Sequence, residues 1–195
     1  MLLMSILIGI LSLITSYFWW TVDWWKPLTL TGTKIGVEDF VMGFSSGGIM
    51  ATIYEVIFKR GLYKRKLYHH AEAALTILLL LSQTTMWLFF YVGLTSFWAS
   101  TFAMLLVAFV IFFIRKDLII TSLLSGILMA IMSLVFYFVI IFISPTWISH
   151  TYLGGISGIR IVGIPIEEFI FWFLAGLVFG PFYEYWQGEK LKAIK

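Results

Sequence analysis

Two pairs of adjacent carboxylic acids stand at the beginning of strongly apolar stretches of this chain. Glu38 and Asp39 lie in IGVEDFVMGF, and Glu167 and Glu168 lie in GIPIEEFIFWF. A charge near hydrocarbon costs several kcal/mol, so carboxylates in such a place are expected to have a function. If the four groups meet, mutual repulsion and loss of water favour a proton on at least one of them at neutral pH. An acid beside a carboxylate can donate one proton and accept another, so all four are candidate catalytic residues.

Helix capping is the competing explanation for these acids. Pro165 suits the first position of a helix, where its missing N–H has no partner to lose. Glu167 and Glu168 would then occupy the first turn, where negative charge gains about 0.3–1 kcal/mol from the helix dipole. Capping explains one acid at each place but not a repeated pair, and we therefore favour the functional interpretation.

The composition indicates an integral membrane protein. The 195 residues are 61% hydrophobic and only 12% charged, with a mean hydropathy of +0.99. A soluble domain carries about twice that share of charge. Long apolar runs predict an all-α, polytopic helix bundle in a single membrane domain, 1–195, because a span needs about 20 apolar residues. We expect about six spans, the first a retained helix rather than a signal peptide, at residues 1–20, 37–58, 71–92, 96–114, 118–143 and 165–186.

The distribution of basic residues predicts the orientation of these spans. Ten Lys and Arg fall on one side of a six-span arrangement and three on the other, the three being Lys26, Lys34 and Arg160. Cytoplasmic loops carry the excess of Lys and Arg, so both termini are expected in the cytoplasm of a multi-pass cell-membrane protein. The basic run 59–66 and the histidines that follow it are then a solvated cytoplasmic loop, with an anionic-lipid or protein patch as the alternative.

The two acidic motifs belong to an internal repeat. Residues 35–55 align without gaps with 164–184, and seven of 21 positions are identical. The two segments are four crossings apart, so they run in the same direction and the repeat is parallel. All four acids are then at the outer end of the membrane. Small residues four apart, at Gly43 and Gly47 and again at Gly176 and Gly180, favour close helix packing.

Aromatic residues surround the acids in the sequence. Those nearest could hold a polyene and stabilise a carbocation through their ring faces, although packing explains many of them equally well. The candidate substrate-binding residues are Phe40, Phe44, Phe169, Trp172 and Phe173. The stretch YFWWTVDWW, 17–25, is interpreted as an aromatic belt at the membrane interface. Its Asp23 is expected either to be a surface carboxylate or to partner the acidic pairs.

Motifs for cofactors are missing from the sequence. The glycine-rich stretch LGGISGIRIVG, 153–163, lies between spans and is expected to be a loop rather than a nucleotide cradle. Cysteine is absent, and the three histidines at 69, 70 and 150 show no metal-ligand spacing. We therefore expect no cofactor, no metal and no nucleic acid. The acids Glu55 and Glu184, which follow a tyrosine in each repeat, have no clear role in the sequence.

The motifs GIPIEEFIFWF and IGVEDFVMGF, with the preceding VDWW, resemble those of the membrane lycopene cyclase domain family. This family includes heterodimeric bacterial, fused archaeal and bifunctional fungal enzymes, and the resemblance is specific over 20–58 and 144–186. It implies that Glu38, Asp39, Glu167 and Glu168 are the essential acids, and that the chain closes the end of lycopene into a ring without a cofactor. Gly36 and Asp39 depart from the second motif, which has Pro165 and Glu168.

Two other functions remain open from the residues. A non-catalytic membrane protein could bind a polyene or lipid, or relay protons, through the same acids. A carotenoid hydratase would begin from the same cation and add water to it. Membrane lipid and a carotenoid or other isoprenoid are the expected partners, and a homo-oligomer is left open.

Overall fold

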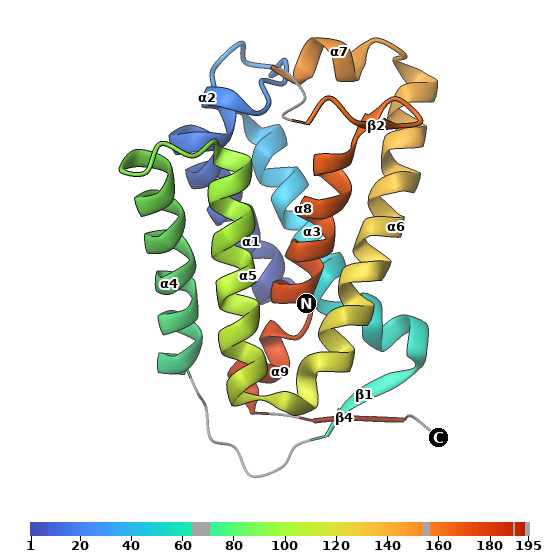
Figure 1. Ribbon diagram of the computed structural model, residues 1–195. Coiled ribbons are helices and arrows are strands. Elements are labelled where there is room, and N and C mark those ends of the chain that lie inside the picture. Colours follow the sequence, from blue (N-terminus) through green and yellow to red (C-terminus); the bar gives the residue numbers. More distant parts are fainter. Residues whose placement is uncertain (64–70, 154–156, 189, 194–195) are drawn as a thin grey trace.

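Long apolar helices run alongside one another through most of the chain (Figure 1). The computed structural model describes residues 1–63, 71–153, 157–188 and 190–193, and the histidines at 69 and 70 lie outside them. The first helical stretch comprises α1 (Leu2–Thr15), η1 (Ser16–Trp20) and α2 (Thr21–Asp23). The other long helices are α3 (Val37–Phe58), α4 (Ala71–Phe90), α5 (Ser96–Ile114), α6 (Ile119–Ile143) and α8 (Ile166–Phe179), with short helices η2 (Lys116–Leu118), α7 (Trp147–Thr151) and α9 (Phe182–Gln187).

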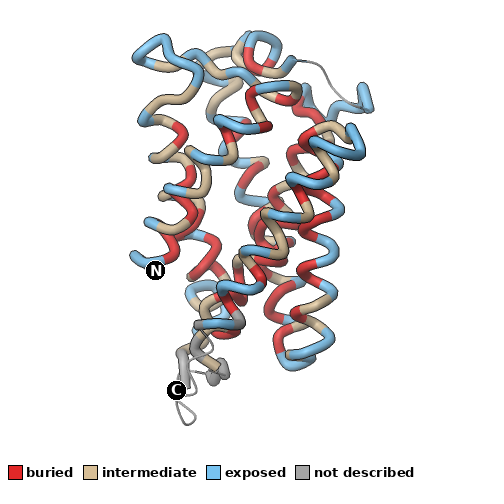
Figure 2. The backbone as a smooth tube through the Cα atoms, turned by 90° about the vertical axis from the view of Figure 1, so that its left-hand side faces the viewer, coloured by how far each residue is buried: buried red, intermediate tan, exposed pale blue. Residues whose placement is uncertain are grey.

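These helices agree closely with the six predicted spans. Five helical stretches of the described residues are long and apolar enough to cross a membrane, and a sixth, in α4, is apolar over Ala74–Phe90. Large apolar side chains cover the outside of the bundle, including Phe142, which is 90% exposed. Figure 2 shows buried residues on the sides where helices face one another and exposed residues on the outer sides. Such a surface suits lipid rather than water.

The helices α3 and α8 both begin at the end of the bundle that lies at the top of Figure 1. Because each acidic pair falls in the first turn of its helix, all four acids lie at this end, which we call the acidic end. The structure thus confirms the prediction that the two motif helices run in the same direction.

Each of these helices packs closely against the long helix that precedes its loop, α3 on α1 and α8 on α6. Glycine makes this approach possible. A Cβ atom at Gly47 would lie 2.7 Å from the Cβ of Ile8, and one at Gly176 would lie 2.7 Å from the backbone oxygen of Ser125. Both distances are too short for a real side chain, so the small residues fix how near the helices come.

The structure departs from the predicted spans at two places. Residues Ser16–Trp20 form a π-helical turn, and the helical stretch therefore continues to Asp23 instead of ending at residue 20. The last span is divided into α8 and α9 at Gly180 and Pro181, because proline cannot donate a backbone hydrogen bond inside a helix.

Two small antiparallel sheets join segments at the ends of the bundle. Strand β1 (Arg60–Tyr63) pairs with β4 (Lys190–Ala193) at the end opposite the acids. Strand β2 (Arg160–Ile161) pairs with β3 (Ile164–Pro165) just before α8. The two residues between β2 and β3, Val162 and Gly163, both have positive φ, as a tight hairpin turn requires.

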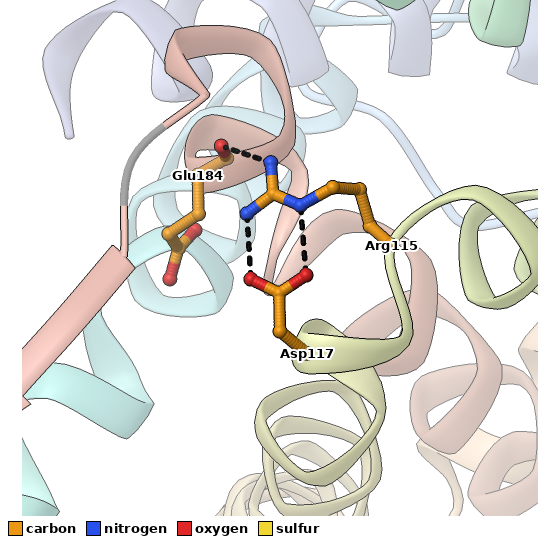
Figure 3. A network of polar contacts seen from close by, with 3 residues as sticks. All are labelled: Arg115, Asp117 and Glu184. Atoms are coloured by element: carbon orange, nitrogen blue, oxygen red, sulfur yellow. Dashed lines mark hydrogen bonds and ion pairs between the residues drawn. The ribbon is translucent and has the colours of Figure 1, made fainter. Parts of the chain in front are cut away.

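A polar cluster holds the chain at the end opposite the acids (Figure 3). The Arg115 guanidinium donates two hydrogen bonds of 2.9 Å to the Asp117 carboxylate. The Nη1 atom of the same guanidinium donates to the backbone oxygen of the buried Glu184 at 3.4 Å. The turn between α5 and α6 is thereby attached to α9, which gives Glu184 a structural setting that the sequence did not indicate.

Replacing Gly47 with leucine is expected to separate α3 from α1, because the new side chain would enter space occupied by Ile8 and Met4. We expect a loss of about 2 kcal/mol or more in the free energy of unfolding. Thermal unfolding of the purified protein in detergent measures it. Val41→Leu on the same helix, at a side chain 54% exposed, should change the midpoint very little. Equal midpoints for the two variants would contradict the packing.

Candidate active site

The structure divides each acidic pair between two environments. Asp39 and Glu168, the second member of each pair, line one cavity of about 190 Å³. Glu38 and Glu167, the first members, do not line it. Consecutive residues of an α-helix point about 100° apart, since a turn has 3.6 residues. The two acids of a pair therefore point in different directions, and only the second of each pair lines the cavity.

The first acid of each pair holds the loop that precedes its helix. Glu38 accepts a hydrogen bond from the backbone N–H of Leu30 at 2.5 Å, and Glu167 accepts one from that of Ser157 at 2.6 Å. Glu38 is half-buried and Glu167 is 2% exposed. Bonds from backbone N–H groups to a carboxylate are among the stronger ones in proteins. These two acids thus fix the loops that cover the acidic end.

Asp39 lies in the first turn of α3 and is held through both of its oxygens. The backbone N–H of Gly36 donates to Oδ2 at 3.0 Å, and the Ser16 hydroxyl donates to Oδ1 at 2.8 Å. The Ser12 hydroxyl also bonds the backbone oxygen of Asp39 at 2.5 Å. Asp39 therefore caps its helix and at the same time faces the cavity. Helix capping and a functional role are thus compatible for this acid.

Glu168 is held by a pair of tyrosines. The Tyr137 hydroxyl of α6 donates a short hydrogen bond to Oε2 of Glu168, and it also bonds the Tyr152 hydroxyl at 2.9 Å. Burial raises the pKa of the Tyr152 phenol well above its usual range, so this group stays protonated. Tyr137 thus takes the place beside Glu168 that Ser16 takes beside Asp39.

The walls of the cavity are mostly apolar and come from α1, η1, α3, α4, α5, α6 and α8. At the acidic end they are aromatic: the Phe171 ring lies 5.3 Å from Trp20 and 5.1 Å from Trp24, edge to face in both contacts. The π-helical turn begins at Ser16 and ends at Trp20, so one irregularity positions both a bond to Asp39 and an aromatic wall. Turns of this kind are frequent at functional sites.

The predicted substrate-binding aromatics have different positions in the structure. Trp172 lines the cavity. Phe40 and Phe173 pack over Gly9 and Gly126 at the helix contacts. Phe44 packs against Phe40, and Phe169 packs at the edge of the hydrophobic core.

The prediction that the tryptophan-rich stretch 17–25 forms an interfacial belt is only partly correct. Tyr17 and Phe18 are about half exposed, as a belt requires. Trp19 and Trp24, by contrast, are each 5% exposed and line the cavity. Asp23 accepts a hydrogen bond from the backbone N–H of Ser96 at 2.9 Å. It therefore anchors the start of α5, and it does not line the cavity that Asp39 and Glu168 line.

Sequence reasoning missed Tyr137 and Tyr152 as part of this site. Tyr137 stands in SLVFYFVIIFI, where a single phenol interrupts a long apolar run. A buried hydroxyl in such surroundings needs a hydrogen-bond partner, and this requirement is the signal that could have singled it out. Among the described residues, no group of three or more His, Cys, Asp or Glu side chains is arranged to hold a metal ion.

Fold and site together define a polytopic helical protein in which carboxylic acids face an apolar, aromatic cavity. A family model for lycopene cyclase matches residues 1–57 and 95–186, which include all four acids. The chain therefore belongs to the lycopene cyclase family, as the acidic motifs predicted, and membership supports carotenoid cyclisation in general terms. No curated protein and no solved structure matches the chain.

Replacing Glu167 with glutamine is expected to loosen the loop before α8, while Asp39 and Glu168 continue to line the cavity. The bond from the Ser157 N–H to a carboxylate contributes about 1.5–3 kcal/mol, so hydrogen exchange of that amide should accelerate about tenfold or more. Exchange followed by NMR or mass spectrometry measures it. Glu168→Gln, one residue away, should leave the Ser157 amide unchanged, and equal acceleration in both variants would contradict the division of roles.

Proposed function

We propose that the protein is a cyclase of lycopene or a closely related linear carotenoid, working by acid–base catalysis without a cofactor. The observation that carries this proposal is the meeting of Asp39 and Glu168, from the two motif helices, at one apolar cavity. An apolar cavity suits a hydrocarbon, and two acids held by different neighbours suit opposite proton transfers.

The proposed reaction moves one proton in and one proton out. The acid protonates the terminal double bond of the polyene, and a carbocation forms. The neighbouring double bond attacks this cation, so one carbon–carbon bond closes the ring and the positive charge moves into it. The base then removes a proton from a carbon beside the charge and restores a double bond. The product has the mass of the substrate, and no oxidant or reductant is required.

Glu168 is assigned as the proton donor and Asp39 as the acceptor. Asp39 has a hydrogen-bond donor at each oxygen, the Gly36 N–H and the Ser16 hydroxyl, and these bonds stabilise a carboxylate. Glu168 is 4% exposed among mostly apolar walls, and this loss of water favours the neutral acid more than the bond donated by the Tyr137 phenol favours the carboxylate. The faces of Trp20, Trp24 and Phe171 stand at the same end of the cavity, where they can stabilise the cation.

The bilayer is the proposed source of the substrate. The apolar outer surface places the cavity within reach of lipid, where a carotenoid dissolves. The excess of Lys and Arg that the sequence carries on one side of the predicted spans supports a cytoplasmic position for both termini. Membrane lipid and the carotenoid are then the partners of the chain.

Replacing Glu168 with glutamine, or Asp39 with asparagine, is expected to abolish cyclisation while preserving size and fold. General acid and base groups each contribute about 10²–10⁴-fold to rate, so either variant should fall by at least about 100-fold. The test is expression in a lycopene-accumulating bacterium, followed by separation of the pigments with mass detection. Glu72→Gln, at an exposed carboxylate at the start of α4, is the matched control and should cyclise normally.

The pigments distinguish the competing functions. A product of unchanged mass and shifted absorption, absent from the Glu168→Gln and Asp39→Asn cells, supports the cyclase. A product heavier by one water identifies a hydratase and contradicts the proposed final step. Unaltered lycopene, with inserted and folded wild-type protein, contradicts cyclisation of this substrate and favours a binding protein.

A further inference from the structure

The helix α4 stands apart from the rest of the bundle. It packs closely against α5 along its length and against α9 at the end opposite the acids. It has no comparably close packing with α1 or α3, although all three helices line the cavity. In Figure 1 α4 lies at the left edge of the bundle, and Figure 2 views the molecule from that side.

The cavity lies nearest to the surface beside α1 and α4. Ile14 of α1, at 45% exposed, is the most exposed of the residues that line it. The facing wall on α4 consists of Leu78, Leu81, Ser82 and Thr85. This side of the cavity lies within two apolar helical stretches, at a level that lipid would surround.

The side of the cavity between α1 and α4 is suited to a hydrocarbon rather than to a polar ligand. The Ser82 hydroxyl donates to the backbone oxygen of Leu79, and the Thr85 hydroxyl donates to that of Leu81. Both polar groups are thereby satisfied within their own helix, and the surface that they present is mostly methyl and methylene. Leu81 and Ile14 complete an apolar passage.

The cavity is too small for a whole linear carotenoid. Its volume of about 190 Å³ is below the range of about 300–1,000 Å³ usual for drug-sized ligands, and a forty-carbon polyene is larger than most such ligands. One end group fits beside Asp39 and Glu168. The remainder of an extended, stiff chain has to leave the cavity, and the side between α1 and α4 is the exit that its residues provide.

We infer that the gap between α1 and α4 is a binding groove for the linear chain of the polyene, with its far end in the bilayer. This inference rests on the proposed function. It follows that the protein processes one end group at a time and accepts substrates that differ at the far end. The residues of α4 that form the groove lie between the two segments matched by the family model.

Tryptophan at position 82 is the test of the groove. Ser82→Trp should narrow the passage, whereas Leu79→Trp adds the same group to a side chain that is 51% exposed and does not line the cavity. Lycopene binding is followed by quenching of tryptophan emission, with the purified proteins in lipid nanodiscs. We expect binding at least about tenfold weaker for Ser82→Trp, and within about twofold of wild type for Leu79→Trp.

A short isoprenoid with the same end group separates the groove from the cavity. It fits inside the cavity alone, so Ser82→Trp should weaken its binding much less than that of lycopene. Ile14→Trp, on the opposite side of the groove, should reproduce the pattern and serves if Ser82→Trp fails to fold. Wild-type affinity for lycopene in both folded variants would overturn the groove, as would an equal loss for the short compound.

Binding and turnover together distinguish this inference from the proposed function. Wild-type protein that binds lycopene through the groove but leaves it uncyclised would contradict the cyclase and support the groove. Wild-type protein that cyclises lycopene, with Ser82→Trp and Ile14→Trp doing so at the same rate, would contradict the groove alone. Wild-type protein that neither binds nor cyclises lycopene would overturn both.

Discussion

The close contact of each motif helix with the helix before it determines where the acids can lie. Gly47 brings α3 onto α1, and Gly176 brings α8 onto α6, at distances that no larger residue permits. At this spacing a short side chain, Ser16, reaches across to Asp39, while the longer Tyr137 reaches Glu168. The cavity and its two acids depend on these contacts, because a wider separation would part Asp39 from Ser16 and Glu168 from Tyr137.

The same helix geometry gives each acidic pair two tasks. One acid bonds a loop at the acidic end and the next faces the cavity, since the direction of the side chain changes by about 100° between them. A single helical turn thus carries both the acid that bonds the covering loop and the acid that faces the cavity. The two halves are similar in this plan and differ in detail: one inner acid is bonded by a backbone N–H and a serine, and the other by a buried phenol. This difference is the basis on which we propose that Glu168 donates a proton and Asp39 accepts one.

Much of the fold followed from hydropathy and spacing. Apolar runs predicted the spans because lipid demands long helices that satisfy their own backbone, and the repeat predicted that both motif helices start at the same end. The π-helical turn at Ser16–Trp20 and the entry of Trp24 into the cavity wall were not predictable, because they depend on contacts between distant segments. The burial of Trp19 was not predictable for the same reason, because composition alone favoured a position at the membrane interface. The resemblance implied four essential acids, but their separation into loop and cavity positions required the three-dimensional arrangement.

Carbodiimide labelling tests most directly whether a protonated Glu168 faces the apolar cavity. A hydrophobic carbodiimide reacts with protonated carboxyl groups that it reaches from lipid, and peptide mass spectrometry locates the modified residue. The account predicts modification of Glu168, suppressed by lycopene and absent from Glu168→Gln, while Glu38 and Glu167 remain unmodified. Modification of Glu167 in place of Glu168, or labelling of Glu168 that lycopene does not suppress, would contradict it.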